Sequence, residues 1–332
     1  MQRAILLLSF SLLPFLIFAQ TTKILGKVVD EKGLPMPYVN VYIKGSTQGT
    51  TSNFEGDFSL ETQGFSPSQL VVFKFVGYRE KSVAISEFAS GPKTIELKPQ
   101  EVSLSEVVIS AKGKDPAYYI MKKASENRKK HEQPLDTYQA KLYMKGRAFF
   151  MEAPDSLNFL IKLSMGEEEK AEVDEQVGKV VYLTESYSKI SYQAPNKIKE
   201  ELLASRQSGT SPGFSPNRSI FLENNFYQSL INQVNERGLI SPLSPNATLY
   251  YDFKLLGKFE ENGFTINRIQ VKPKRKVDPV FEGEIFIVHD RWNIHSLNLS
   301  VNDDAIDNGL LDSVTYKQSY QILPNDVWMP LS

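Results

Sequence analysis

The residues best suited to metal or nucleophilic chemistry are few, since the chain has three histidines and no cysteine. A zinc peptidase needs clustered ligands, such as two histidines one helical turn apart with a nearby carboxylate, because the metal requires convergent lone pairs. His131 follows a basic segment, His289 lies at an expected turn and His295 lies in an expected strand. We expect each to be a surface or packed residue. The lack of cysteine also removes thiol nucleophiles, disulfides and a lipoprotein anchor.

One acidic group could in principle do chemistry. Asp303, Asp304 and Asp307 could bind a cation through hard oxygen ligands, or could supply the acid and nucleophile of a glycosidase. Their spacing is not diagnostic, and a polar loop explains them better, since Asn302 and Gly309 add turn character. The sequence also has no Gly-x-Ser-x-Gly elbow, phosphate loop or dinucleotide fingerprint. It therefore assigns no catalytic, cofactor-binding or metal-binding residue.

Two basic clusters allow anion binding, although solvated surface charge explains both. The first is one face of an expected helix, and the second is the connection Lys272-Pro-Lys-Arg-Lys. The helix face contains Lys122, Lys123, Arg128, Lys129 and Lys130, which could attract anionic head groups. The net charge of the whole chain is -1, so nothing draws it as a whole to nucleic acid.

The first residues predict export. Arg3 precedes an uncharged apolar run, residues 4–18, and Ala19 then precedes a polar segment. This pattern is typical of a secretory signal peptide, residues 1–19, cleaved after Ala19. A membrane anchor is the alternative, but the run falls short of the roughly 20 residues that span a bilayer. No later segment is long and apolar enough to span as a helix. We therefore expect a periplasmic or outer-membrane location.

Residues 23–99 alternate like the strands of a β-sandwich. Short apolar runs are separated by turn residues, and about seven strands fit before Pro99, as in immunoglobulin-like or transthyretin-like folds. Residues 70–76 form a nearly continuous apolar run, which predicts a central strand. The predicted core consists of Val39, Val41, Phe58, Leu60, Phe73, Phe75, Ile95 and Leu97.

Several strings in this segment carry a resemblance. They are Gly26-Lys-Val-Val-Asp, Gly33-Leu-Pro-Met-Pro-Tyr-Val-Asn-Val, Gly45-Ser-Thr-Gln-Gly-Thr, Asn53-Phe-Glu-Gly-Asp-Phe and Val76-Gly-Tyr. Residues 23–98 resemble a carboxypeptidase-regulatory-like domain. The resemblance implies an accessory fold without catalysis of its own, of the kind found at the front of exported Bacteroidota proteins, including TonB-dependent receptors.

The rest of the chain predicts a connector and a second, α+β domain with an antiparallel sheet. Residues 100–135 comprise a connector strand at 104–111 and a helix from Asp115-Pro116 to about Lys130, whose apolar positions are Ala117, Ile120, Met121 and Ala124. Residues 136–332 comprise strands from 137 and 180, an acidic loop within 167–175, a long loop at 205–217, a weakly helical segment at 221–234, an antiparallel meander at 249–301 and a strand at 313–323. The chain is therefore expected to be mainly β.

A second resemblance covers most of residues 23–330. It rests on Asp115-Pro-Ala-Tyr, Glu126-Asn-Arg-Lys-Lys, Ile240-Ser-Pro-Leu-Ser-Pro, Val271-Lys-Pro-Lys-Arg and Phe281-Glu-Gly-Glu-Ile. These strings are similar to the amino-terminal part of Bacteroidota envelope proteins of unknown function that end in an outer-membrane β-barrel. The resemblance implies that such a barrel follows the present chain and is its partner. The alternative is that the strand at 327–330 simply closes the second domain.

Two functions from different classes remain open. The first is a non-enzymatic periplasmic module that binds or positions an outer-membrane-associated protein through sheet faces and edges. The second is a hydrolase of envelope glycans or peptides whose carboxylates converge only in the fold. The first is preferred, because the chain resembles accessory domains and has no catalytic motif from which a reaction could be argued. No cofactor is expected.

Overall fold

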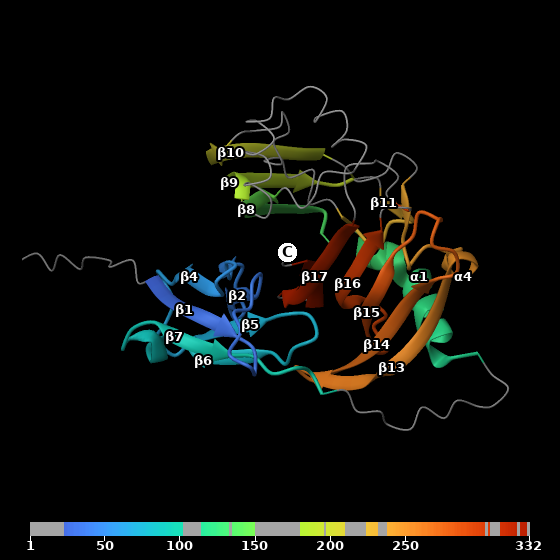
Figure 1. The fold of residues 1–332 in the computed structure, drawn as a ribbon, viewed down its shortest axis with the longest axis horizontal. Coiled ribbons are helices and arrows are strands. Elements are labelled where there is room, and N and C mark those ends of the chain that lie inside the picture. Colours follow the sequence, from blue (N-terminus) through green and yellow to red (C-terminus); the bar gives the residue numbers. More distant parts are fainter. Residues whose placement is uncertain are drawn as a thin grey trace, which may run out of the picture. The chain divides into compact units, whose positions relative to one another are not determined.

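The computed structural model describes residues 23–101, 114–132, 135–149, 180–195, 197–209, 224–231, 238–302, 305, 313–323 and 326–330 (Figure 1). The chain divides into two compact units, the first ending at Gln100 and the second beginning at Glu101. The fold is mainly β with one long helix, as the sequence predicts.

The first unit is a β-sandwich of seven strands, which confirms the predicted number. One sheet has the strand order β4-β1-β7 and the other β3-β2-β5-β6. The strand β1 lies in the middle of its sheet, because it pairs antiparallel with β4 and parallel with β7. The bounds are β1 Lys23–Val29, β2 Asn40–Ile43, β3 Gly49–Thr51, β4 Asp57–Glu61, β5 Leu70–Lys74, β6 Lys81–Ala84, the 3-10 helix η1 Ile85–Phe88 and β7 Lys93–Glu96.

The core between these two sheets matches the predicted one closely. Seven of the eight expected side chains are buried, and Phe75 is partly buried against them. Phe58 packs edge-to-face on Phe73 from the opposite sheet, with ring centroids 5.2 Å apart. The corner before β2 is fixed by Ser52, whose hydroxyl accepts from the Val39 amide at 2.9 Å and donates to the Met36 carbonyl at 2.7 Å.

The second unit begins with helix α1, Pro116–Glu132, at the predicted position. Asp115 caps it, since its Oδ1 accepts from the Ala117 amide at 2.9 Å. The four apolar positions predicted for the buried face are all buried. They join a core formed with the antiparallel sheet that follows, so α1 packs as part of this unit.

That sheet has six strands in sequence order, which confirms the predicted meander. Its first turn, Asn262-Gly263, has positive φ at both residues (51° and 80°), as a two-residue type I′ hairpin requires. The short helix α4, Ala247–Tyr250, precedes the sheet, and the small β11–β12 pair lies before it in sequence. The bounds are β11 Leu230–Ile231, β12 Leu239–Ile240, β13 Tyr251–Glu261, β14 Phe264–Pro273, β15 Glu282–Val288, β16 Ile294–Asn302, β17 Ser313–Leu323 and β18 Val327–Pro330.

A separate three-stranded antiparallel sheet has the order β10-β9-β8. Its strands are β8 Thr137–Phe149, β9 Val180–Gln193 and β10 Lys197–Gly209. The first two were predicted. The predicted loop at 205–217 is wrong at its start, because residues 205–209 belong to β10. Likewise, residues 224–231 form a turn and strand β11 where the sequence suggested weak helix.

Some predictions concern residues outside those described. They are the signal peptide, the connector strand at 104–111, the acidic segment at 167–175 and the aspartates 303, 304 and 307. Among the described ranges, no helix is both long and apolar enough to cross a membrane.

Candidate functional site

The first candidate site is a groove in the second unit between α1 and the segment 242–248, with a volume of about 660 Å³. We call it the helix groove. Asp115 fixes one end, because the same Oδ1 that caps α1 also accepts from the Leu255 amide of β13 at 2.9 Å. A single carboxylate oxygen thus ties the start of the helix to the sheet.

Aromatic side chains form the wall of the helix groove on this side. The Tyr118 ring packs edge-to-face on Phe253 at 5.7 Å, and the Lys114 ammonium lies 5.7 Å from the Tyr118 ring centroid. The Tyr118 hydroxyl donates to Asp252 Oδ1 at 2.8 Å. Burial, followed by the hydrogen bond to Asp252, raises the pKa of Tyr118. This phenol therefore acts as a hydrogen-bond donor near neutral pH.

The rim of the helix groove carries paired charges. The Lys122 and Lys123 ammonium groups lie 3.8 and 3.3 Å from the two carboxylate oxygens of Glu126. Beside them, Tyr119 is 59% exposed, with the Lys123 ammonium 5.8 Å from its ring centroid. Aromatic faces, donors and charges of both signs suit the recognition of a partly polar ligand. The predicted basic face of α1 is thus partly neutralised by Glu126.

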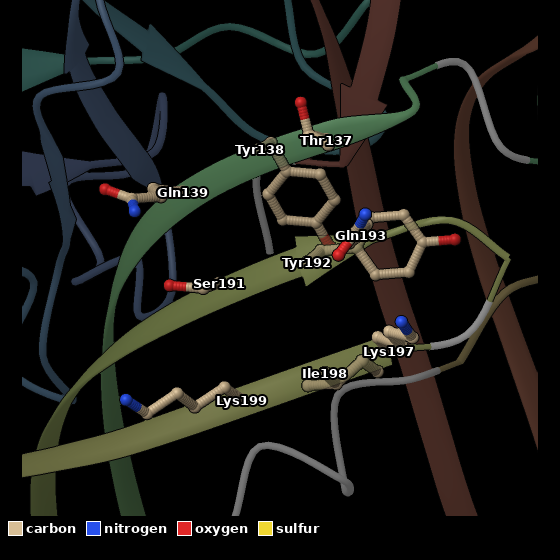
Figure 2. A pocket seen from close by; sticks show the side chains of 9 residues that line it. All are labelled: Thr137, Tyr138, Gln139, Ser191, Tyr192, Gln193, Lys197, Ile198 and Lys199. Carbon is tan, nitrogen blue, oxygen red and sulfur yellow. The ribbon is translucent and has the colours of Figure 1, made fainter.

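The second candidate site is a groove of about 670 Å³ on the three-stranded sheet (Figure 2). Tyr138 of β8 and Tyr192 of β9 are directly paired in register, and their rings stack with centroids 5.0 Å apart. The Tyr192 hydroxyl donates to the Pro195 carbonyl at 3.0 Å. Figure 2 shows Lys197, Ile198 and Lys199 of β10 along the same groove. The groove offers ring faces for stacking beside ammonium groups.

A third constellation looks like a catalytic relay. His295 Nε2 lies 2.7 Å from Glu261 Oε1, and His295 Nδ1 lies 3.1 Å from Ser296 Oγ. However, His295 and Ser296 are only 4% and 3% exposed, and neither lines either of the two grooves. A nucleophilic hydroxyl must reach its substrate. His295 packs beside Phe259 and Trp328, so the arrangement fits the packed residue that the sequence predicts.

The remaining residues considered from the sequence do not converge. His131 Nε2 lies 3.1 Å from the Arg291 carbonyl, and its ring packs on Tyr227. His289 packs against Trp292 and lies 3.6 Å from Asp290. Within the part of the chain that the structure describes, no group of three or more histidines, cysteines and acids could hold a metal ion. The aspartates 303, 304 and 307 lie outside that part.

Sequence reasoning missed both grooves and the Glu261–His295 contact. The walls of the helix groove come from segments more than 100 residues apart in the sequence. The Asp115-Pro116 signal located one wall correctly. No periodic pattern signalled the opposite wall at 242–248, because it is a turn that leads into the four-residue helix α4.

Comparison with known proteins confirms the resemblance of the first domain. Residues 24–109 match the CarboxypepD_reg-like domain. The TonB-dependent receptor P39 of Formosa agariphila is 35% identical over 112 residues, which cover 33% of this chain and 10% of the receptor. The TonB-dependent receptor SusC of Bacteroides thetaiotaomicron is 31% identical over 96 residues, which cover 29% of this chain and 9% of the receptor. The chain spans about a tenth of the length of these curated relatives.

The larger part of the chain is matched as a unit. A solved structure, that of MucB, superposes with a TM-score of 0.25 at 11% identity, covering 60% of this chain and 56% of that one, which is too loose to support a fold assignment. By sequence, residues 120–332 match the family of unknown function DUF5686. Because this match spans more than half of the chain, the protein belongs to the DUF5686 family.

Proposed function

We propose that the chain is a non-enzymatic binding or positioning module of an outer-membrane-associated protein in the periplasm. The observation that carries this proposal is that residues 24–109 match the CarboxypepD_reg-like domain, together with about a third identity to several TonB-dependent receptors over roughly 100 residues. The seven-stranded sandwich has its own core, as an accessory domain joined to other machinery requires.

The second unit supplies the surface for binding. The helix groove is open, has aromatic walls and presents both donors and paired charges. Such a site can hold a ligand in place without reacting with it. The partly buried Glu261 and the buried His295 and Ser296 lie outside that groove and have packing roles.

Fractionation of cells that express the protein at its natural level tests the location. We expect the mature chain in the envelope fraction, with an amino terminus near Gln20 by mass spectrometry, because residues 1–19 have the pattern of a signal peptide. Recovery from the cytosol with Met1 intact would contradict the proposal.

Site-specific photocrosslinking tests the binding role. A photoreactive phenylalanine analogue at Tyr119, on the rim of the helix groove, is expected to crosslink in living cells to an outer-membrane protein. The same analogue at Leu34, which is equally exposed at 59% but lies in the first unit, is the matched control. Equal crosslinking at both positions would show nonspecific contact.

An activity screen separates this proposal from the hydrolase alternative. Wild-type protein and the Ser296→Ala variant are compared on envelope glycans and on peptides. We expect no turnover by either protein. A hydrolytic activity that Ser296→Ala abolishes, in a variant that keeps its fold, would establish the hydrolase instead.

A further inference from the structure

One end of the second unit carries two unusually exposed apolar side chains. Leu249 of helix α4 is 69% exposed and Val277 of the loop between β14 and β15 is 67% exposed. These are the two highest exposures among the large hydrophobic residues that the structure describes. We call the surface that they form with Lys272, Lys274 and Lys276 the basic apolar patch.

Two hydrogen bonds donated by Lys274 hold the two parts of this patch together. The Lys274 amide donates to the Tyr250 carbonyl at 2.8 Å, and the Lys274 ammonium donates to the Thr248 carbonyl at 2.7 Å. Leu249 lies between these two acceptors in the chain, so α4 and the loop are joined on both sides of it. Figure 1 shows α4 at the end of the sheet where β13 begins.

The loop itself has a defined shape. The Arg275 guanidinium nitrogen Nε lies 2.9 Å from Asp278 Oδ2, and the Asp278 amide donates to the Arg275 carbonyl at 3.4 Å. Val277 therefore sits on a turn that is closed by its neighbours. Because the turn is already ordered, binding through the Val277 side chain would cost little further conformational entropy.

Lys274 is held by the Thr248 carbonyl and lies 3.8 Å from Asp252 Oδ1, but the other two lysines of the patch are not used in this way. Lys272 and Lys276 are exposed, and their ammonium groups form no hydrogen bond or ion pair with any residue that the structure describes. In contrast, Lys122 and Lys123 are paired with Glu126. The positive charge at Lys272 and Lys276 is thus available to an external anion.

We propose that the basic apolar patch binds the surface of an anionic phospholipid bilayer. Lysines near such a surface are attracted by the head groups, and their long apolar stems let the ammonium groups stay at the polar boundary. Leu249 and Val277 then enter the boundary between head groups and acyl chains. This inference goes beyond the proposed function, which does not require contact with lipid.

The shape of the patch favours a bilayer over a peptide. Peptide and small-molecule sites are concave, whereas neither of the two grooves is lined by Leu249, Val277 or the three lysines. A short helix and a turn that each present an apolar side chain beside lysines match a broad, deformable anionic surface better than a single side chain of a partner.

Sedimentation with lipid vesicles tests the proposal, using residues 20–332 of the chain. Wild-type protein is expected to bind phosphatidylcholine vesicles that contain phosphatidylglycerol, and not vesicles of phosphatidylcholine alone. Binding should weaken at high salt because ions screen the attraction. Each lysine near an anionic surface contributes about a fivefold gain in partitioning, so Lys272→Gln with Lys276→Gln should lower it roughly 20-fold or more.

Two further variants complete the test. Leu249→Ser with Val277→Ser keeps every charge and is also expected to lose binding, because apolar contact is removed. Lys32→Gln with Lys98→Gln, two exposed lysines of the first unit, changes the net charge equally and should bind like wild type. Circular dichroism checks that each variant is folded, and the salt titration of the wild type does not depend on any variant.

The proposal is overturned if wild-type protein does not distinguish the two kinds of vesicle. It is also overturned if the control pair loses as much binding as the patch pair, or if the serine variant binds like wild type. Binding of polyglutamate, but not of vesicles, with the same dependence on Lys272 and Lys276 would assign the patch to an acidic protein instead.

Discussion

At the scale of single residues, Tyr251 connects distant backbone segments in the core of the second unit. Its buried hydroxyl donates to the Ile240 carbonyl and accepts from the Phe281 amide, the latter at 3.0 Å. Burial raises the pKa of Tyr251, so the phenol keeps its proton. One hydroxyl therefore hydrogen-bonds to backbone groups of two segments that lie far apart in the sequence.

Removal of that hydroxyl should be costly. We expect Tyr251→Phe to lower the free energy of unfolding by about 1 to 3 kcal/mol, because a buried donor and acceptor lose their partner. Urea denaturation followed by tryptophan fluorescence measures this, since both tryptophans, Trp292 and Trp328, lie in the second unit. Tyr118→Phe, which removes a solvent-exposed hydrogen bond to Asp252, is the control and should cost less.

His131 gives the second unit a pH dependence with a definite sign. Burial lowers the pKa of His131 below that of the unfolded chain, despite its contact with the Arg291 carbonyl. The unfolded state therefore binds the proton more readily, and stability is full above about pH 6.5 and is lost as the pH falls.

The variant His131→Gln tests this sign. The difference in the free energy of unfolding between wild type and this variant should shrink as the pH falls from about 7.5 to about 5.5, because only the wild type takes up a proton at this position. The urea midpoint at each pH is the measurement. A difference that stays constant across that range would show that His131 does not titrate as inferred.

At the scale of elements, Asp115 is the residue on which α1 depends. Its Oδ1 accepts from two amides, one in the first turn of the helix and one in β13. We expect Asp115→Ala to lower the free energy of unfolding by about 2 kcal/mol or more, since both a cap and a bond to the sheet are lost. Asp115→Asn keeps the acceptor oxygen and should cost less than half as much. Equal losses for the two variants would assign the effect to charge alone.

The elements that the sequence predicted are those that bury one face. Strand β13 alternates buried and exposed residues along its length, and α1 buries its four expected positions, so their periods are visible in the sequence. Strand β10 was missed because residues 201–208 are all exposed, which leaves no apolar alternation to detect. Strand β3 has only three residues, and its pairing partner β2 decides its conformation.

The sites were less predictable than the elements for a related reason. The helix groove depends on how α1 packs against a segment far along the chain, and the contact between Glu261 and His295 joins residues 34 apart on strands β13 and β16 of one sheet. Such contacts depend on tertiary packing and leave no local period. The sequence could identify a cluster of basic residues at 272–276, but not which of its lysines form an ion pair within the chain.

At the scale of the whole molecule, the two units have separate hydrophobic cores that share no residue. We therefore expect residues 23–100 to fold when expressed alone. In that domain, Phe73→Ala should lower the free energy of unfolding by about 3 to 5 kcal/mol, because Phe73 is fully buried and contacts Phe58. Chemical denaturation followed by circular dichroism measures the change. An unchanged midpoint would show that this core has been misread.

The central position of β1 in its sheet has a consequence for biogenesis. Residues 26–29 of β1 pair with residues 93–96 of β7, so this pairing cannot form until the last strand of the sandwich is present. A chain that crosses a membrane amino terminus first cannot complete this sheet until about 70 further residues have emerged, and closing so long a loop is slow. For a chain exported as proposed above, the sandwich therefore closes only after its last strand has emerged.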